Sequence, residues 1–96
     1  MAYRVLYSQT SRDQVRSLHP RIKPVVKGYV ERLKENPFLG KPLERELSGY
    51  YSLRSKRFRI IYTINDDNHV IQIYYVGHRR DVYQLFRELL SREKDD

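Results

Sequence analysis

YYSLRSKRFRIIYTINDDNHVIQIYYV, residues 50–76, contains three runs rich in Tyr, Ile and Val in which side-chain character alternates from one residue to the next. The runs cover residues 50–54, 58–64 and 70–76, and such runs are typical of β-strands. The segment Asn65-Asp66-Asp67-Asn68 has the composition of a hairpin turn. Because the connections are short, the sequence predicts an antiparallel meander of three strands.

The chain before this stretch predicts one more strand and a short helix. Tyr3, Val5 and Tyr7 alternate with their neighbours as in a strand, which is free to add to the edge of the sheet. Thr10, followed three residues later by Asp13, resembles a capping box that opens a short helix through about residue 18.

A longer helix is predicted next from one continuous apolar stripe, formed by Ile22, Val25, Val26, Tyr29, Val30 and Leu33. Its start lies near Pro20 or Pro24, since proline is tolerated in a first turn, and Asn36-Pro37 ends it. We expect both helices to cover one face of the sheet. Residues 37–49 are expected to form a connecting loop.

Residues 81–94 return to helical spacing, with one apolar side formed by Val82, Leu85, Phe86, Leu89 and Leu90. This stripe either packs on the domain or remains partly exposed as a surface for a partner. A chain of 96 residues with 40% hydrophobic content is expected to form a single domain, residues 1–96. The expected fold class is α+β: a small antiparallel sheet, two N-terminal helices on one face, and a C-terminal helix.

The composition favours a polyanionic partner. The 19 Lys and Arg residues against 12 Asp and Glu residues give a formal net charge of +7. Such a field attracts nucleic acid, and an acidic protein would exploit the same charge. The absence of cysteine excludes disulfides, thiolate metal sites and thiol nucleophiles. The histidines lack metal-ligand spacing and no glycine-rich phosphate loop is visible, so neither a metal nor a cofactor is expected. No segment has the length of a signal peptide or membrane span, which favours a cytoplasmic location.

Basic residues and a tyrosine mark the candidate functional surface. Alternation places Arg54 on the same side of its strand as Ser52, and sends Arg59 to the outer side of the next strand. The two arginines flank a turn that contains Lys56 and Arg57 and are expected to converge. The third strand runs out toward His78, Arg79 and Arg80, and Tyr83 lies in the first turn of the last helix. Such a patch suits RNA, because arginine forks match phosphate oxygens and aromatic rings stack on unpaired bases. Each residue taken singly is more typical of a solvated surface, a cap or the rim of the core.

Four segments recur in a recognisable order: NPFLGKPL (residues 36–43), LSGYYSLR (47–54), FRIIY (58–62) and VGHRRDVY (76–83). Together they resemble the RelE/ParE superfamily of bacterial and archaeal toxins from toxin–antitoxin pairs. The resemblance covers nearly the whole chain. It implies a β-α-α-β-β-β fold with a C-terminal extension, in agreement with the elements predicted from periodicity.

The resemblance also implies an activity, that of the RelE-like members: cleavage of mRNA on the ribosome, without a metal, by attack of a ribose 2′-hydroxyl on the adjacent phosphate. Arg54, Arg59 and Arg79 fall on positions that hold the phosphate or neutralise its charge, and Tyr83 falls on that of the functional tyrosine. Contacts to RNA are expected from Lys56, Arg57, His78 and Arg80. The implied partners are mRNA on the ribosome and a cognate antitoxin protein.

The chain departs from the family pattern at two positions that bear on mechanism. Ser52 stands where many members place a second basic residue, which Lys56 or Arg57 would replace. Lys41 stands where the YoeB branch has its glutamate base, so a tyrosine or His78 would have to transfer the proton. A ParE-like inhibitor of DNA gyrase without nuclease activity, or a degenerate RNA-binding member, are the alternative functions.

Overall fold

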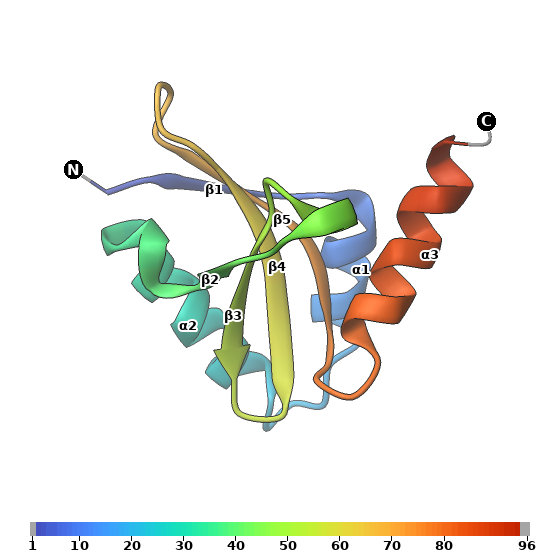
Figure 1. Cartoon of the computed structure of the whole chain (residues 1–96). Helices are drawn as coiled ribbons and strands as arrows, with labels where there is room; N and C mark the ends of the chain where they lie inside the picture. The colour runs from blue at the N-terminus through green and yellow to red at the C-terminus, as the bar shows by residue number, and fades with distance from the viewer. Residues whose placement is uncertain (1, 95–96) are drawn as a thin grey trace.

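A five-stranded sheet lies at the centre of the computed structural model, which describes residues 2–94. The strands stand in the order β1-β5-β4-β3-β2 (Figure 1). They are β1 (Arg4–Tyr7), β2 (Lys41–Pro42), β3 (Tyr51–Ser55), β4 (Phe58–Asn65) and β5 (Val70–His78). The other elements are α1 (Gln9–Arg16), α2 (Lys23–Glu35), α3 (Val82–Lys94) and two 3-10 turns, η1 (Pro37–Leu39) and η2 (Arg45–Leu47).

The sheet confirms the predicted meander, because β3, β4 and β5 pair antiparallel in sequence order. β1 adds to one edge, parallel to β5. The other edge corrects a prediction: residues 37–49 are not all loop, since Lys41 and Pro42 pair with β3 as the short strand β2. Two residues carry no alternation signal, and the pairing is supported just beyond them by the Leu43 amide, which donates to the Tyr50 carbonyl at 2.8 Å.

The helix starts differ from the predicted ones in an instructive way. The N-cap of α1 is Ser8 and not Thr10, because the Ser8 side chain accepts a hydrogen bond from the amide of Ser11 at 3.1 Å. A hydroxyl residue that can cap a helix stands at both positions in the sequence. α2 begins at Lys23 with Pro24 in its first turn, which was one of the two predicted starts.

Two apolar cores lie on opposite faces of the sheet. α1 and α2 cover one face, as predicted, and bury residues such as Leu33 and Tyr62. α3 covers part of the other face, where Ile61, Val82 and Phe86 are almost fully buried. In Figure 1 α3 stands apart from α2, on the other side of the strands. The face that carries the arginines is therefore partly roofed by α3.

None of the described helices is long and apolar enough to cross a membrane.

Candidate active site

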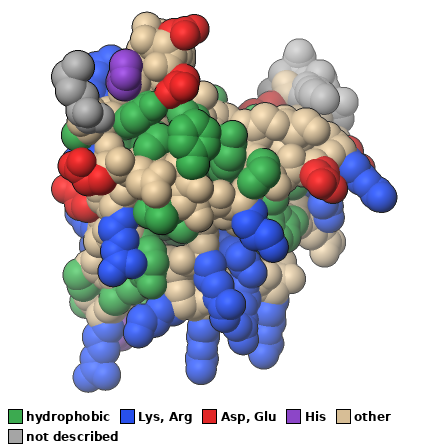
Figure 2. Space-filling model, turned by 60° about the vertical axis from the view of Figure 1, so that its left-hand side comes forward, with side chains coloured by type: hydrophobic (Ala, Val, Ile, Leu, Met, Phe, Trp, Pro, Cys, Tyr) green, Lys and Arg blue, Asp and Glu red, His purple; other side chains and the backbone are tan. Residues whose placement is uncertain are grey.

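Basic side chains gather at the end of the molecule formed by the β3–β4 hairpin and the β5–α3 connection. Figure 2 shows Lys and Arg side chains projecting from this lower end, whereas the acidic side chains in view lie higher. The basic residues of this hairpin and this connection are called the basic end, and they are Arg54, Lys56, Arg57, Arg59, Arg79 and Arg80. Within residues 2–94, none of the six takes part in an ion pair. Their positive charge is therefore available to an external anion.

Arg54 and Arg59 are direct cross-strand partners in the β3–β4 ladder. Opposite residues of an antiparallel pair project from the same face, with Cβ atoms roughly 4.5–5.5 Å apart. Like charges in this arrangement repel and destabilise the sheet. An anion placed between the two side chains would relieve this repulsion.

Arg59 lies in β4 between an arginine of β3, Arg54, and a glycine of β5. Its β5 partner is Gly77. A Cβ atom at Gly77 would lie 3.1 Å from a ring carbon of Tyr75 and 3.3 Å from a methyl carbon of Val82, so glycine permits close packing of α3 beside Arg59. The Arg59 Nε atom is buried and has no hydrogen-bond partner among the described residues. An arginine with an unused buried donor is suited to a ligand.

Tyr83 lies over the same face of the sheet, in the first turn of α3. Its hydroxyl oxygen lies 2.9 Å from the Ser52 hydroxyl oxygen, and either group can donate. Ser52 is 2% exposed and lies two residues before Arg54, on the same face of β3. The structure therefore brings Arg54, Arg59 and Tyr83 to one face, as predicted. The sequence predicted no contact for Ser52, although its position two residues before Arg54, on the same side of the strand, was the signal that could have identified it.

Arg79 lies at the same end of the sheet. Its amide donates to the Arg57 carbonyl at 2.7 Å, which extends the β4–β5 ladder one residue beyond the Phe58–His78 pair. Arg79 directly follows β5 and is exposed in the turn before α3. Lys56 and Arg57 form the exposed tip of the adjacent hairpin.

His78 is separated from the arginines. It pairs with Phe58 and its ring packs edge-on against the Phe58 ring, with centroids 5.8 Å apart. Phe58 belongs to the core under α1 and α2, so His78 lies on the opposite face from Arg59. The His78 Nδ1 atom accepts a hydrogen bond from the Arg80 amide at 3.3 Å, which shapes the β5–α3 turn. Arg80 itself is exposed in that turn.

This arrangement has a definite chemical capacity. Guanidinium groups from separate elements can bind the non-bridging oxygens of a phosphodiester. The paired hydroxyls of Tyr83 and Ser52 can accept and donate protons. No group of three or more His, Asp or Glu side chains in the described part of the chain could hold a metal ion.

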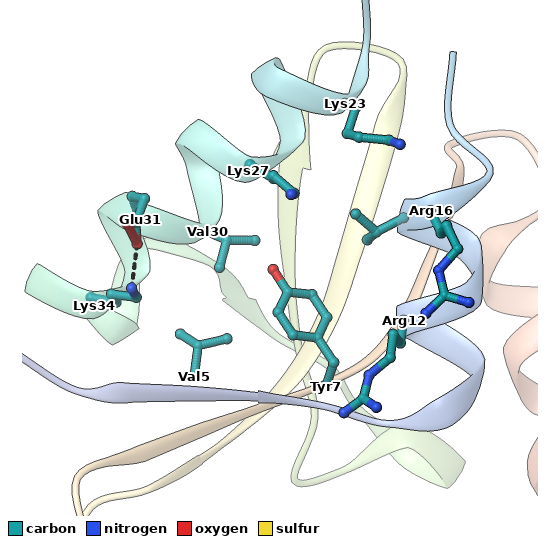
Figure 3. Close-up of a pocket in the computed structure, with 10 residues that line it drawn as sticks. Val5, Tyr7, Arg12, Arg16, Lys23, Lys27, Val30, Glu31 and Lys34 are labelled. Atoms are coloured by element: carbon teal, nitrogen blue, oxygen red, sulfur yellow. Dashed lines mark ion pairs between the residues drawn. The ribbon is translucent and has the colours of Figure 1, made fainter. Parts of the chain in front are cut away.

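A further basic pocket lies on the other face, between β1, α1 and α2 (Figure 3). It has a volume of about 480 Å³, and its cations are Arg12, Arg16, Lys23, Lys27 and Lys34. Lys34 is paired with Glu31 at 2.6 Å. Tyr7 lies in the same pocket, and burial raises the pKa of its phenol. This pocket was missed from the sequence, although the spacing of four between Arg12 and Arg16 and between Lys23 and Lys27 was visible.

The chain matches a known family model over residues 2–83, described as the ParE toxin of the type II toxin–antitoxin system parDE. The match includes all five strands and ends at Tyr83. The chain belongs to the RelE/ParE superfamily of type II toxin–antitoxin toxins. The resemblance drawn from the four sequence segments is thereby confirmed.

Relatives of this RelE/ParE toxin carry RelE-type names. Toxin RelG of Mycobacterium tuberculosis is 38% identical over 86 residues, which cover 88% of this chain and 99% of RelG. Toxin RelE of the same organism is 31% identical over 85 residues, 86% of this chain and 88% of that toxin. In the crystal structure of the toxin–antitoxin complex RelBE2 from M. tuberculosis, one chain matches with a TM-score of 0.77 and 36% identity, covering 82% of this chain and all of that one. The isolated Escherichia coli RelE toxin shares the fold, with a TM-score of 0.68 at 22% identity over 93% of this chain and 99% of that toxin.

Proposed function

We propose that this toxin is a metal-independent, ribosome-dependent endoribonuclease that cleaves mRNA. The observation that carries the proposal is the placement of Arg54 directly opposite Arg59, on the face where the Tyr83 hydroxyl contacts Ser52. Two arginines that are cross-strand partners and have no ion-pair partner among the described residues suit a phosphodiester, and neighbouring hydroxyls suit proton transfer. The RelE-type names of the relatives support the same class of activity.

In the reaction, the phosphoryl group is transferred from the 5′-oxygen to the 2′-oxygen within the RNA. The ribose 2′-oxygen bonds to the adjacent phosphorus, and the bond from phosphorus to the 5′-oxygen breaks. The products are a 2′,3′-cyclic phosphate and a free 5′-hydroxyl. One proton leaves the 2′-oxygen and one must reach the 5′-oxygen, so no external reactant is needed.

The side chains divide this work by position. Arg54 and Arg59 neutralise the charge that develops on the non-bridging oxygens of the pentacoordinate phosphorus, and Arg79 approaches from the β5–α3 side. Tyr83 transfers a proton, with Ser52 as its hydrogen-bond partner. His78 lies on the opposite face and takes no part in this step.

The remaining basic residues guide the RNA. Lys56, Arg57 and Arg80 are exposed at the tip of the basic end and contact the phosphate backbone on either side of the scissile bond. Each phosphate contact to a single strand contributes about 0.7 to the slope of log affinity against log salt. Binding to RNA is therefore expected to weaken steeply as salt rises.

A cognate antitoxin is the second partner. The matched M. tuberculosis chain was crystallised in a toxin–antitoxin complex. A net charge of +7 favours an acidic segment in the antitoxin, and Leu85 on α3 is 39% exposed and offers an apolar contact. Neutralising the basic end would block access of RNA.

Inhibition of DNA gyrase is the second candidate function. The family model that matches the chain is described by the ParE toxin, and the neutral Ser52 reduces the cationic character of the face. A gyrase inhibitor would need no nuclease chemistry. A degenerate member that binds RNA without cutting it is distinguished by the absence of cleavage products.

Inducible expression in bacteria, with 5′-end mapping of total RNA and a gyrase supercoiling assay in parallel, tests these functions. New 5′-hydroxyl ends at fixed codon positions, lost on Arg59→Ala, are expected for the nuclease. Gyrase-dependent DNA breaks without new RNA ends would overturn the proposal in favour of the inhibitor.

A further inference from the structure

A separate pocket of about 300 Å³ lies between the start of α2 and the β3–β4 hairpin. Its walls include Ile22 and Val25 from the α2 side and Phe58 from β4, all half-buried. Arg21, Lys56 and Arg57 line it as well and are exposed, so they form a basic rim. The pocket lies on the face of the sheet opposite Arg59, because Phe58 and Ile22 pack on the core under α1 and α2.

Ser55 gives this pocket an unused polar group. The residue is 1% exposed, lines the pocket, and its hydroxyl has no hydrogen-bond partner among the described residues. Burying a hydroxyl without a partner is costly, so native proteins normally supply one. A resident water needs two to four polar partners, whereas the side chains beside Ser55 on the inner wall are those of Ile22, Val25 and Phe58. A ligand with a hydrogen-bonding edge and apolar faces fits better.

We propose that this pocket is a subsite for one nucleobase of the RNA strand that occupies the basic end. The proposal rests on the proposed function, since the base in the pocket belongs to the RNA strand that is cleaved. A base has flat apolar faces for the walls and a polar edge for Ser55, whose hydroxyl can donate or accept. The ribose phosphate then meets Arg21, Lys56 and Arg57 at the rim.

The competing occupants satisfy only part of this lining. An aliphatic side chain from a protein would fill the walls but leave the Ser55 hydroxyl unpaired. An acidic peptide would neutralise the rim but bring no apolar group to Phe58. A nucleotide combines the ring, the polar edge and the phosphate in one unit.

The β3–β4 hairpin connects the pocket with the face of the sheet that carries Arg54 and Arg59. Arg57 lines the pocket, and its carbonyl accepts the hydrogen bond from the Arg79 amide. Phe58 lines the pocket, while the next residue, Arg59, projects from the opposite face. A strand that passes the hairpin tip can therefore present a phosphate to Arg59 and a neighbouring base to Ser55. The pocket would then select the sequence that flanks the cut.

Amide chemical shifts of the full-length toxin, titrated with AMP, GMP, CMP, UMP and inorganic phosphate, test the subsite. At least one nucleotide is expected to shift the amides of Ser55, Val25 and Phe58, whereas inorganic phosphate should perturb the rim alone. Ser55→Ala should weaken the binding of that nucleotide about fivefold or more, the usual loss of affinity for one base-edge contact. Val25→Phe should abolish its binding by filling the pocket, and Ser17→Ala, an exposed serine at the end of α1, is the matched control.

Cleavage mapping separates this proposal from the proposed function. Ser55→Ala and Val25→Phe should still cut mRNA but with an altered preference beside the cut, whereas Arg59→Ala should stop cutting. Unchanged preference together with unchanged nucleotide binding overturns the subsite and leaves the nuclease standing. A wild type that cuts no RNA but whose Ser55 amide shifts with a nucleotide overturns the nuclease and supports the subsite. Stronger shifts with hexaglutamate than with any nucleotide would overturn the subsite in favour of a peptide.

Discussion

The hydroxyl groups of Tyr83 and Ser52 lie 2.9 Å apart and join the first turn of α3 to the start of β3. The contact fixes the position of the tyrosine over the face that carries Arg54 and Arg59. Val82, the preceding residue, is fully buried against the sheet beside Gly77. The burial of Val82 and the hydrogen bond of Tyr83 therefore both fix the start of α3 on the sheet.

Tyr83→Phe removes the hydroxyl and keeps the ring. If Tyr83 transfers a proton, the yield of cleaved mRNA should fall by about 10²–10⁴-fold, the usual contribution of a positioned acid or base. The free energy of unfolding should change by about 1 kcal/mol, because one side-chain hydrogen bond is lost. Primer extension on a defined transcript and urea unfolding measure the two effects. Tyr29→Phe on α2 is the matched control, and equal cleavage by both variants would remove Tyr83 from the mechanism.

Arg54→Gln should separate function from stability. The substitution relieves like-charge repulsion with Arg59, so the free energy of unfolding should rise by about 0.2–1 kcal/mol. Cleavage should fall by about 10²–10³-fold, as when one donor to a charged transition state is lost. Arg87→Gln, an exposed arginine on α3, controls for net charge. A less stable Arg54→Gln variant with wild-type cleavage would show that this arginine serves the fold.

The side on which a strand residue lies was predictable where alternation is unbroken. Arg54, Arg59 and Ser52 follow the rule, because the direction of a strand side chain is a local property. The expected helices and strands appear for the same reason, with boundaries set by local caps and prolines.

The placement of His78 was not predictable, because it depends on a bulge in β5. Ile73 pairs with Tyr62, but Tyr75 pairs with Ile61, which leaves Tyr74 without a partner. This irregularity reverses the alternation of the residues that follow. It turns His78 toward Phe58 and away from Arg59, and it brings Gly77 beside Arg59 instead. Nothing local in the sequence marks the extra residue, because it is defined only by the pairing with β4. The Tyr83–Ser52 contact was hidden likewise, because it depends on how α3 docks.

Tyr62→Phe should destabilise the fold and reduce the loss of stability as the pH rises above 10. The Tyr62 hydroxyl donates to the Pro37 carbonyl at 2.7 Å and accepts from the Gly40 amide at 3.0 Å. Leaving these buried groups unpaired should cost about 1–3 kcal/mol in urea unfolding. Tyr29→Phe again serves as the control.

The pH dependence follows from the pKa of Tyr62, which burial raises to about 12 although the Gly40 hydrogen bond lowers it. The phenol ionises near pH 10 in the unfolded chain, so the folded state retains the proton more tightly. The stabilisation is complete below about pH 10 and is lost as the pH rises toward 12. Wild-type stability should therefore fall more steeply above pH 10 than that of Tyr62→Phe. Parallel curves for the two proteins would contradict the raised pKa.

Gly40→Ala should destabilise the protein through the same hydroxyl. A Cβ atom at Gly40 would lie 2.5 Å from the Tyr62 hydroxyl oxygen and 2.8 Å from the Ser52 carbonyl oxygen, closer than atoms can approach. Since the second contact is with backbone, β2 would have to move from β3, at a cost of about 1–3 kcal/mol. Gly28→Ala is the control: it lies inside α2 with nothing within 4 Å of its Cβ position, and should stabilise by about 0.5–1 kcal/mol.

The double variant Gly40→Ala with Tyr62→Phe tests whether the two effects share one cause. Tyr62→Phe removes the atom nearest to the new methyl group, so Gly40→Ala should cost less in that background than in the wild type. The residual cost reports the contact with the Ser52 carbonyl. Because Ser52 also holds Tyr83, displacement of β3 should lower cleavage in Gly40→Ala, and Tyr62→Phe should restore part of it. Strictly additive unfolding free energies would show that Gly40 and Tyr62 do not interact in this way.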